Sequence, residues 1–164
     1  MIIIADQITK LNFEMLAALQ ARQIELARKK NYRHLSKQEG MTCAKQDYYE
    51  YLRDVFFSRM HGEIYIYEED GCYICGVCFE PYKDGLLLNS LVTLKDYRRK
   101  GYAEKLLVFA LEHLNGRPVY SHIHENNFAS IRLHEKLGFQ FLYSYGHMLD
   151  GTVRSNHFTY IKII

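Results

Sequence analysis

The fold is decided by one stretch of the sequence, Leu91-Val92-Thr93-Leu94-Lys95-Asp96-Tyr97-Arg98-Arg99-Lys100-Gly101-Tyr102-Ala103. Its first part is an apolar, strand-like segment that ends in a basic cluster and a glycine, and a helical pattern begins directly afterwards. This order brings backbone N–H groups, the positive end of a helix dipole and cationic side chains to one place. We therefore expect a site for a phosphate or pyrophosphate group at the carboxyl end of a strand.

The length and composition of the chain limit the number of domains, the classes of partner and the cellular location that we expect. With 164 residues, the chain is expected to form one domain, residues 1–164, whose core needs no disulfide or structural metal. The formal net charge of +2 is too small to favour nucleic acid or an acidic membrane surface as a partner. No apolar run has membrane-spanning length, and residues 1–6 lack the basic region of a signal peptide. We therefore expect a cytoplasmic protein.

Three cysteines recur at a spacing of three, Cys72, Cys75 and Cys78, which raises the question of a metal site. They lie in a segment typical of a strand, where residues three apart point to opposite faces. Cys75 therefore cannot easily join the other two around one ion. We expect small apolar fillers in a reducing compartment, and we predict no metal site.

The first sixty residues have a mainly helical pattern. Helices are expected near residues 7–30 and 45–60, joined by the polar stretch of residues 31–42. No linker rich in Pro, Ser or Gly divides the sequence, which agrees with one domain.

From Glu63 onward the pattern changes to strands. Residues 63–68 and 72–79 flank Asp70-Gly71, as in a β-hairpin. A third strand, residues 86–94, follows the turn at residues 83–85. These three strands predict an antiparallel meander.

An amphipathic helix follows the anion site, and Asn115-Gly116 is expected to end it. The apolar stripe of this helix has helical spacing and consists of Ala103, Leu106, Leu107, Ala110, Leu111 and Leu114. The next strand is residues 119–123, so residues 86–123 predict a strand–helix–strand unit with a parallel crossover.

A second helix is predicted over residues 128–137. Asn127 is suited to cap its start, and Gly138 fits the left-handed residue after its last turn. Residues 139–148 and 153–163 would complete the chain as a terminal hairpin. Together these elements predict one α/β domain around a mixed sheet.

Two motifs resemble the GNAT N-acetyltransferase superfamily. The acyl-CoA signature of that family is Gln or Arg, two residues, Gly, one residue, then Gly or Ala, and the chain reads Arg98-Arg99-Lys100-Gly101-Tyr102-Ala103. The second motif is Asn127-Phe128-Ala129-Ser130-Ile131-Arg132-Leu133-His134-Glu135-Lys136-Leu137-Gly138-Phe139, similar to the family's Asn, Ala or Ser, Leu-Tyr or Leu-His, Glu-Lys-x-Gly-Phe. Both follow a strand in the family's order, so the resemblance covers about the last two-thirds of the chain.

The resemblance implies a fold, namely a mixed, mostly antiparallel central sheet flanked by helices, with a β-α-β core that binds acyl-CoA. Amides from Arg99 to Ala103 would bind the CoA pyrophosphate, and Gly101 would be needed because a side chain there would block the loop. A backbone N–H around Thr93 or Leu94 would polarise the thioester carbonyl. The cofactor contacts that the resemblance implies are Leu91, Val92, Thr93, Arg98, Arg99, Lys100, Gly101, Tyr102, Ala103, Asn127, Ser130 and His134.

His134 is the main departure from the family pattern. Many members have Tyr here, whose hydroxyl is proposed to protonate the leaving CoA thiolate. A histidine can do the same with a pKa nearer neutrality. We expect a catalytic or cofactor-contacting role for His134; the alternative is an ordinary helix residue that packs against the cofactor.

A general base is also needed, because the acceptor amine must lose a proton. Residues 85–90 lack the Glu that several relatives carry on this strand. His122 and His124 share one face of the next strand and Glu80 ends another, so all three are candidates. A core or surface role is nevertheless favoured for each of them. As a metal pair, the two histidines lack a third ligand.

In the family, the amino-terminal helices and the terminal hairpin wall the acceptor pocket. Aromatic side chains of the first sixty residues are candidates for this lining, although aromatics in helices more often belong to the core. The candidates are Tyr32, Tyr48, Tyr49, Tyr51, Phe56 and Phe57.

The resemblance implies an N-acetyltransferase that moves an acetyl group from acetyl-CoA to a primary amine by direct attack in a ternary complex. We expect a small-molecule amine, because no strongly acidic or basic docking surface stands out. Two alternatives stay open: a non-catalytic acyl-CoA-binding or sensing domain, and an acetyltransferase for protein N-termini or lysines. Dinucleotide binding fails, because its fingerprint needs three glycines where this loop has one. A homodimer is compatible with the sequence, which does not decide it.

Overall fold

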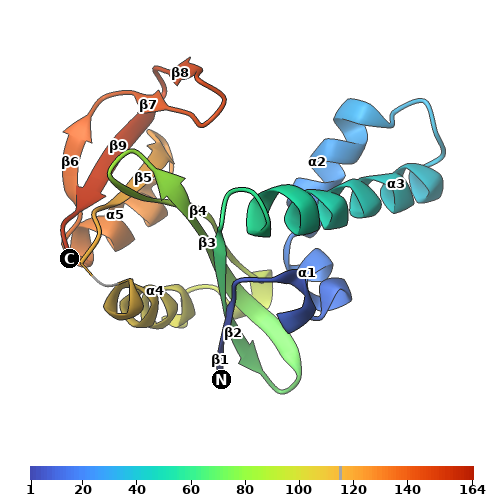
Figure 1. The fold of residues 1–164 in the computed structure, drawn as a ribbon, viewed down its shortest axis with the longest axis horizontal. Helices are drawn as coiled ribbons and strands as arrows, with labels where there is room; N and C mark the ends of the chain where they lie inside the picture. The colour runs from blue at the N-terminus through green and yellow to red at the C-terminus, as the bar shows by residue number, and fades with distance from the viewer. Residues whose placement is uncertain (115) are drawn as a thin grey trace.

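A mixed sheet of seven strands forms the centre of the computed structural model, which describes residues 1–114 and 116–164. The strands lie in the order β1-β2-β3-β4-β5-β9-β6 (Figure 1). Neighbouring strands run antiparallel, except that β4 and β5 run parallel. The predicted class, an α/β fold with a mixed and mostly antiparallel sheet, is confirmed.

The elements follow one another with short connections (Figure 1). The first part contains β1 (Ile2–Ala5), η1 (Ile8–Lys10), α1 (Phe13–Leu19), α2 (Ala21–Asn31), α3 (Lys37–Glu50) and its π-helical continuation η2 (Tyr51–Phe57). The middle contains β2 (Glu63–Glu69), β3 (Cys72–Tyr82), β4 (Gly85–Thr93), η3 (Lys95–Tyr97), α4 (Tyr102–His113) and β5 (Val119–His124). The last part contains α5 (Phe128–Lys136), β6 (Gln140–Tyr143), β7 (Gly146–His147), β8 (Val153–Arg154) and β9 (His157–Lys162).

Helices cover both faces of the sheet, and α4 lies on the opposite side from α1 and η2 (Figure 1). On one face, Leu106 and Leu107 of α4 pack with Val77 of β3 in the larger core cluster. On the other face, Leu16 of α1 and Phe56 of η2 belong to a second cluster. Each helix therefore buries its apolar stripe against the sheet, which is the main source of its stability.

Most elements of the last two-thirds agree with the sequence. The antiparallel meander β2-β3-β4 and the parallel pair β4-β5 around α4 are confirmed. The Asn127 side chain accepts from the Ser130 N–H at the start of α5, and Gly138 after its end has a φ of +82°. The predicted stop of α4 at Asn115-Gly116 falls partly on Asn115, which lies outside the described residues, and α4 itself ends at His113.

The terminal hairpin is confirmed but is more elaborate than predicted. β6 pairs with β9 antiparallel, and β9 inserts between β5 and β6. The chain between them turns out of the sheet to form the separate two-stranded sheet β7-β8. The predicted strand over residues 139–148 is therefore two short strands.

The amino-terminal predictions are wrong in their boundaries. The expected helix over residues 7–30 is divided into η1, α1 and α2, because Asn12 caps α1 and the chain bends at Gln20 between α1 and α2. The expected helix over residues 45–60 begins already at Lys37, where Ser36 and Glu39 form a reciprocal capping box. The strand β1, which pairs with β2 at the sheet edge, was not predicted.

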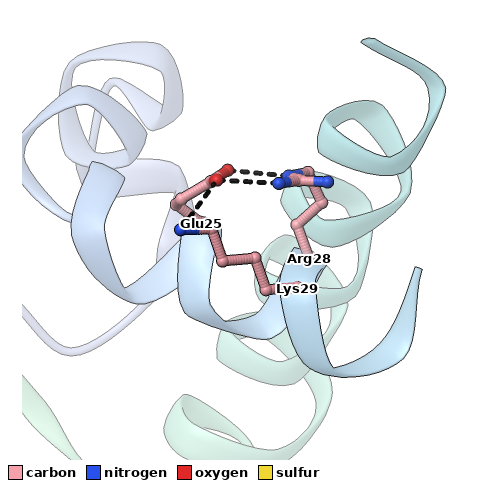
Figure 2. A network of polar contacts seen from close by, with 3 residues as sticks. All are labelled: Glu25, Arg28 and Lys29. Carbon is pink, nitrogen blue, oxygen red and sulfur yellow. Dashed lines mark hydrogen bonds and ion pairs between the residues drawn. The ribbon is translucent and has the colours of Figure 1, made fainter. Parts of the chain in front are cut away.

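An ion pair on α2 lies where α2 and α3 approach each other. Arg28 donates two hydrogen bonds to the carboxylate of Glu25, at 2.7 and 2.8 Å, and Lys29 adds a longer contact at 3.7 Å (Figure 2). The Arg28 hydrogen bonds lower the pKa of Glu25 to about 2. A Cβ at Gly40 of α3 would lie 3.2 Å from Cγ of Arg28, so the two helices pack closely here.

The cysteines behave as the strand pattern predicts. Cys75 belongs to the core cluster under α4, whereas Cys78 belongs to the cluster on the other face of the sheet. Cys72 is exposed, so the expectation of a small apolar filler is wrong for this cysteine. None of the described helices is long and apolar enough to cross a membrane.

We predict that Gly85→Ala destabilises the protein. A Cβ at Gly85 would overlap the carbonyl group of Pro118, 2.8 Å from its carbon, and backbone atoms cannot rotate away. The free energy of unfolding, measured by urea denaturation, should fall by about 1–3 kcal/mol or more. Gly71→Asn is the control, because a Cβ there meets nothing within 4 Å and Asn tolerates its φ of +71°. Equal losses for both variants would contradict the argument.

Candidate functional site

The candidate site begins where β4 leaves β5. The two strands pair only at residues 86–88 of β4, although β4 continues to Thr93. Between the β3 partners Gly76 and Cys78 the register shifts, so β4 carries an extra residue there. Ser90 in this bulge has a φ of +52°, and its N–H donates to Oδ1 of Asn89 at 2.8 Å. The bulge turns the end of β4 away from β5.

This parting leaves backbone groups of β4 without a strand partner. The Leu94 N–H donates to the carbonyl of Ile74 on β3 at 2.9 Å. Because backbone groups alternate along an antiparallel strand, those of Thr93 point away from β3, toward the gap beside β5. The carbonyl of Thr93 accepts from Nε of Arg98 at 3.0 Å, which leaves its N–H as the donor facing the gap. Of the two predicted oxyanion donors, Leu94 is engaged and Thr93 is the suitable one.

The basic loop leads directly into α4. Gly101 caps the helix with a φ of +84°, and Arg99 also has a positive φ of +63°. A Cβ at Gly101 would meet no other part of the protein within 4 Å. Glycine is therefore favoured here by the left-handed backbone conformation, and not by crowding within the protein. The amides of the first turn of α4 have no intrahelical acceptor and point toward the loop, an arrangement that suits an anion.

A cavity of about 450 Å³ lies beside this loop, and we call it the loop cavity. It brings together seven of the predicted cofactor residues: Leu91, Val92, Thr93, Arg98, Ala103, Asn127 and Ser130. The other lining residues are Gln20, Arg22, Gln23, Ser90, Ala129 and Leu133. Arg99, Lys100, Tyr102 and His134 are not part of its wall, and Gly101 borders a different hollow on the outer side of α4.

A second cavity, of about 470 Å³, lies next along β4, and we call it the histidine cavity. Its lining is mostly polar and consists of Gln23, Leu87, Leu88, Asn89, His122, Met148, Leu149, Asp150, Arg154 and His157. Gln23 borders both cavities, and on β4 the lining passes directly from Asn89 to Ser90. Gln20, Arg22 and Gln23 carried no motif, so sequence reasoning missed them.

His134 lies behind the wall of the loop cavity and is only 1% exposed. Its Nδ1 lies 2.8 Å from the carbonyl of Ser130, so Nδ1 carries the proton and donates. Its Nε2 is buried and has no hydrogen-bond partner among the described residues. Burial lowers the pKa of His134, opposed by the Ser130 carbonyl. The ring is therefore neutral at neutral pH and keeps a free acceptor nitrogen.

The three candidate bases differ in position. Glu80 is 2% exposed, its Oε1 accepts from Nδ2 of Asn89 at 3.0 Å, and burial raises the pKa of its carboxyl. His124 lies outside the walls of both cavities and contacts the ring of His157. His122 borders the histidine cavity, and burial lowers its pKa.

The six aromatic candidates from the first sixty residues border neither cavity, within the described part of the chain. Phe56 and Phe57 are buried in the core against the sheet, and Tyr48 and Tyr49 pack at its edge. The core interpretation is therefore confirmed for these four. Among residues 1–114 and 116–164, no group of three or more His, Cys, Asp or Glu side chains is placed to hold a metal ion.

The sequence matches a family model described as "Acetyltransferase (GNAT) family" over residues 24–139. Because this match spans well over half of the chain, the chain belongs to the GNAT acetyltransferase family. The resemblance that the two motifs carry is thereby confirmed. No curated protein sequence matches the chain.

Solved structures share the fold over almost the whole chain. Aminoglycoside 6′-acetyltransferase type Ii superposes with a TM-score of 0.65 at 12% identity, covering 99% of this chain and 96% of that one. The PaiA N-acetyltransferase of Thermoplasma acidophilum, in complex with coenzyme A, gives 0.61 at 17% identity, covering 100% and 99%. The ribosomal-protein-S18-alanine N-acetyltransferase of Escherichia coli gives 0.60 at 17%, covering 100% and 94%. At these identities the likeness shows the fold alone.

We predict that Glu80 makes the protein less stable as the pH rises. Its folded pKa lies above the ordinary value of 4.5, so the folded state keeps a proton that the unfolded chain releases. Stability from this group is present below pH 4.5 and is lost as the pH rises through the raised folded pKa. In urea denaturation at pH 5 and pH 8, Glu80→Gln should gain relative to wild type at the higher pH. An unchanged difference between the two proteins would mean that Glu80 is ionised in the fold.

Proposed function

We propose that the chain is an acetyl-CoA-dependent N-acetyltransferase for the primary amine of a small molecule. The observation that carries this proposal is the junction of the loop cavity and the histidine cavity at Gln23. One cavity offers the anion-binding loop and the free backbone of β4, and the other offers a polar chamber beside it. A cofactor and an acceptor placed in the two cavities would meet beside Thr93.

The loop cavity has the donors that acetyl-CoA needs. The first-turn amides of α4 and the guanidinium of Arg98 suit the pyrophosphate. The unpaired backbone of β4 suits the amide groups of the pantetheine arm, which would add to the sheet edge like a strand. Asn127 and Ser130 line the opposite wall from α5. Coenzyme A is present in the structure of the PaiA enzyme, which has the same fold.

The chemistry follows from this arrangement. The acceptor nitrogen attacks the thioester carbonyl, the N–C bond forms, and the Thr93 N–H stabilises the negative charge on the carbonyl oxygen. The C–S bond then breaks, the sulfur leaves with the electron pair, and the nitrogen gives up a proton. The neutral His134 ring holds its proton on Nδ1. We propose that its Nε2 first takes up a proton from water and then delivers that proton to the departing thiolate.

The size and polarity of the histidine cavity favour a small acceptor. About 470 Å³ is within the range of small-molecule sites, roughly 300–1,000 Å³. The similar structures include enzymes named for an aminoglycoside and for a ribosomal-protein alanine, so their names do not decide between a small molecule and a protein.

A thiol-release assay tests the proposed function. The full chain is mixed with acetyl-CoA and with amino acids, polyamines, aminoglycosides or peptides in turn. Release of CoA with at least one small amine is expected. Tight acetyl-CoA binding without release across the whole panel would favour the binding or sensing alternative, and release with peptides alone would favour a protein acetyltransferase.

We predict that Gly101→Glu abolishes acetyl-CoA binding in isothermal titration calorimetry. The carboxylate would stand at the helix end where the pyrophosphate is expected, and the side chain would strain a φ of +84° by about 1–3 kcal/mol. Gly116→Glu is the matched control, since Gly116 has a φ of +72° and lies after α4. Retained binding in Gly101→Glu would refute the phosphate-loop hypothesis.

We predict that His134→Phe lowers kcat by about a hundredfold, the lower end of general acid–base effects. His113→Phe is the control, because His113 makes the same Nδ1 contact to a carbonyl four residues earlier, at 2.8 Å to Phe109, at the far end of α4. Steady-state kinetics with the best acceptor gives the comparison. Full turnover in His134→Phe would leave this residue only a packing role.

A further inference from the structure

His122 lies at the end of a hydrogen-bond relay that fixes its tautomer. It is the register partner of Thr159 on the neighbouring strand β9. The Thr159 hydroxyl donates to the carbonyl of Tyr145 at 2.5 Å, so its oxygen is left to accept. This oxygen lies 2.9 Å from Nδ1 of His122. A neutral His122 ring therefore carries its proton on Nδ1.

The other nitrogen of His122 is left with a free lone pair. Nε2 is buried and has no hydrogen-bond partner among the described residues, although the ring borders the polar histidine cavity. Such an orphaned polar atom is uncommon in folded proteins and costs stability. Because Nε2 is buried, an acceptor N–H in the cavity would reach it after a small movement of the side chains around the ring.

The surroundings of the ring favour its neutral form. Burial lowers the pKa of His122, opposed by the backbone of His147, and neighbouring cationic groups lower it further. The Tyr82 ring meets the imidazole edge to face, with 5.4 Å between centroids. The titratable and charged groups around the ring are Tyr82, Lys83, His147 and His157, with Asp150 and Arg154 on the cavity wall.

Gly146 fixes the ring from the side of β7. A Cβ there would lie 3.3 Å from Cγ of His122 and 3.3 Å from Cβ of His157. It would also lie 2.8 Å from the end of Met148. The backbone of β7 therefore packs closely against the imidazole, and a side chain at position 146 would press on His122 and His157. The relay sets the tautomer of the ring.

We propose that His122 is the general base of the acetyl transfer, with Thr159 as the residue that positions it; this inference rests on the proposed function. Nε2 takes the proton from the acceptor nitrogen as that nitrogen bonds to the thioester carbon and the C–S bond breaks. The resulting imidazolium later releases the proton to solvent. Glu80 and His124 fit this task less well because both lie outside the walls of the two cavities.

The first experiment is the pH profile of kcat/KM for the best acceptor. In the wild type, kcat/KM should fall on the acid side with a pKa below the ordinary 6.5 of histidine. His122→Gln should lose about 10²–10³-fold in kcat/KM and lose this acid limb. Its affinity for acetyl-CoA, measured by calorimetry, should be unchanged. His124→Gln, on the same strand, should keep both rate and profile.

The second experiment tests the relay without using activity. Nitrogen NMR of labelled protein at pH 8 should show the His122 proton on Nδ1 in the wild type and in Thr159→Ser. Thr159→Val removes the acceptor, so it should show a mixture of tautomers and lose about tenfold in kcat. Thr159→Ser keeps the hydroxyl and should restore the rate.

The outcomes separate the two proposals. If acetyl-CoA binds and no amine reacts, the proposed function is wrong and the base has no reaction to serve. If the wild type turns over and His122→Gln keeps the acid limb, only the assignment of His122 is wrong. Loss of the limb in Glu80→Gln instead would identify Glu80 as the base. A wild-type proton on Nε2 would overturn the relay, whatever the rates.

Discussion

The parting of β4 from β5 is the constraint on which the rest of the candidate site depends. Parallel pairing stops after residues 86–88, because the bulge at Ser90 turns the strand aside. The Asn89 side chain satisfies the Ser90 N–H at the bend, and Glu80 holds the Asn89 amide from below. Unpaired backbone in a sheet is normally costly. Here the unpaired backbone of β4 is the edge that the proposed pantetheine arm would join as an extra strand.

The amino-terminal helices provide a part of the cavity lining that β4 and β5 do not provide. The first turn of α2 contributes Gln23 to the lining of both cavities, so the shape of the cavities depends on the position of α2 relative to β4. Helix α2 packs closely on α3 beside Gly40. The ion pair of Glu25 and Arg28 lies on the same part of α2 (Figure 2). The pair is partly exposed, so we expect it to contribute little to stability.

The two-thirds of the chain that carry strong local signals were predictable from sequence, and the rest was not. Gly101, Asn127 and Gly138 have backbone or capping roles that their residue types reveal directly. Gln23 has no such signal, since its role comes from where α2 lies against β4. The sequence also did not predict that the helix expected over residues 7–30 is divided. Helical periodicity continues through Gln20, whereas the bend at Gln20 depends on how the helices pack on the sheet. The bulge at Ser90 was invisible because a bulge depends on the partner strand.

In the proposed mechanism, the half-buried His122 and the buried His134 would have unequal shares of the proton chemistry. Both His122 and His134 hold a proton on Nδ1, leave Nε2 unpaired, and have a pKa lowered by burial. A neutral imidazole with a free lone pair is ready to act as a base, but it must first gain a proton to act as an acid. A thiol ionises near pH 8.5, so a thiolate leaves with little help from an acid at about neutral pH. The amine, in contrast, cannot form the amide without losing a proton. In the proposed mechanism, proton removal beside the histidine cavity therefore matters more than proton delivery beside the loop cavity.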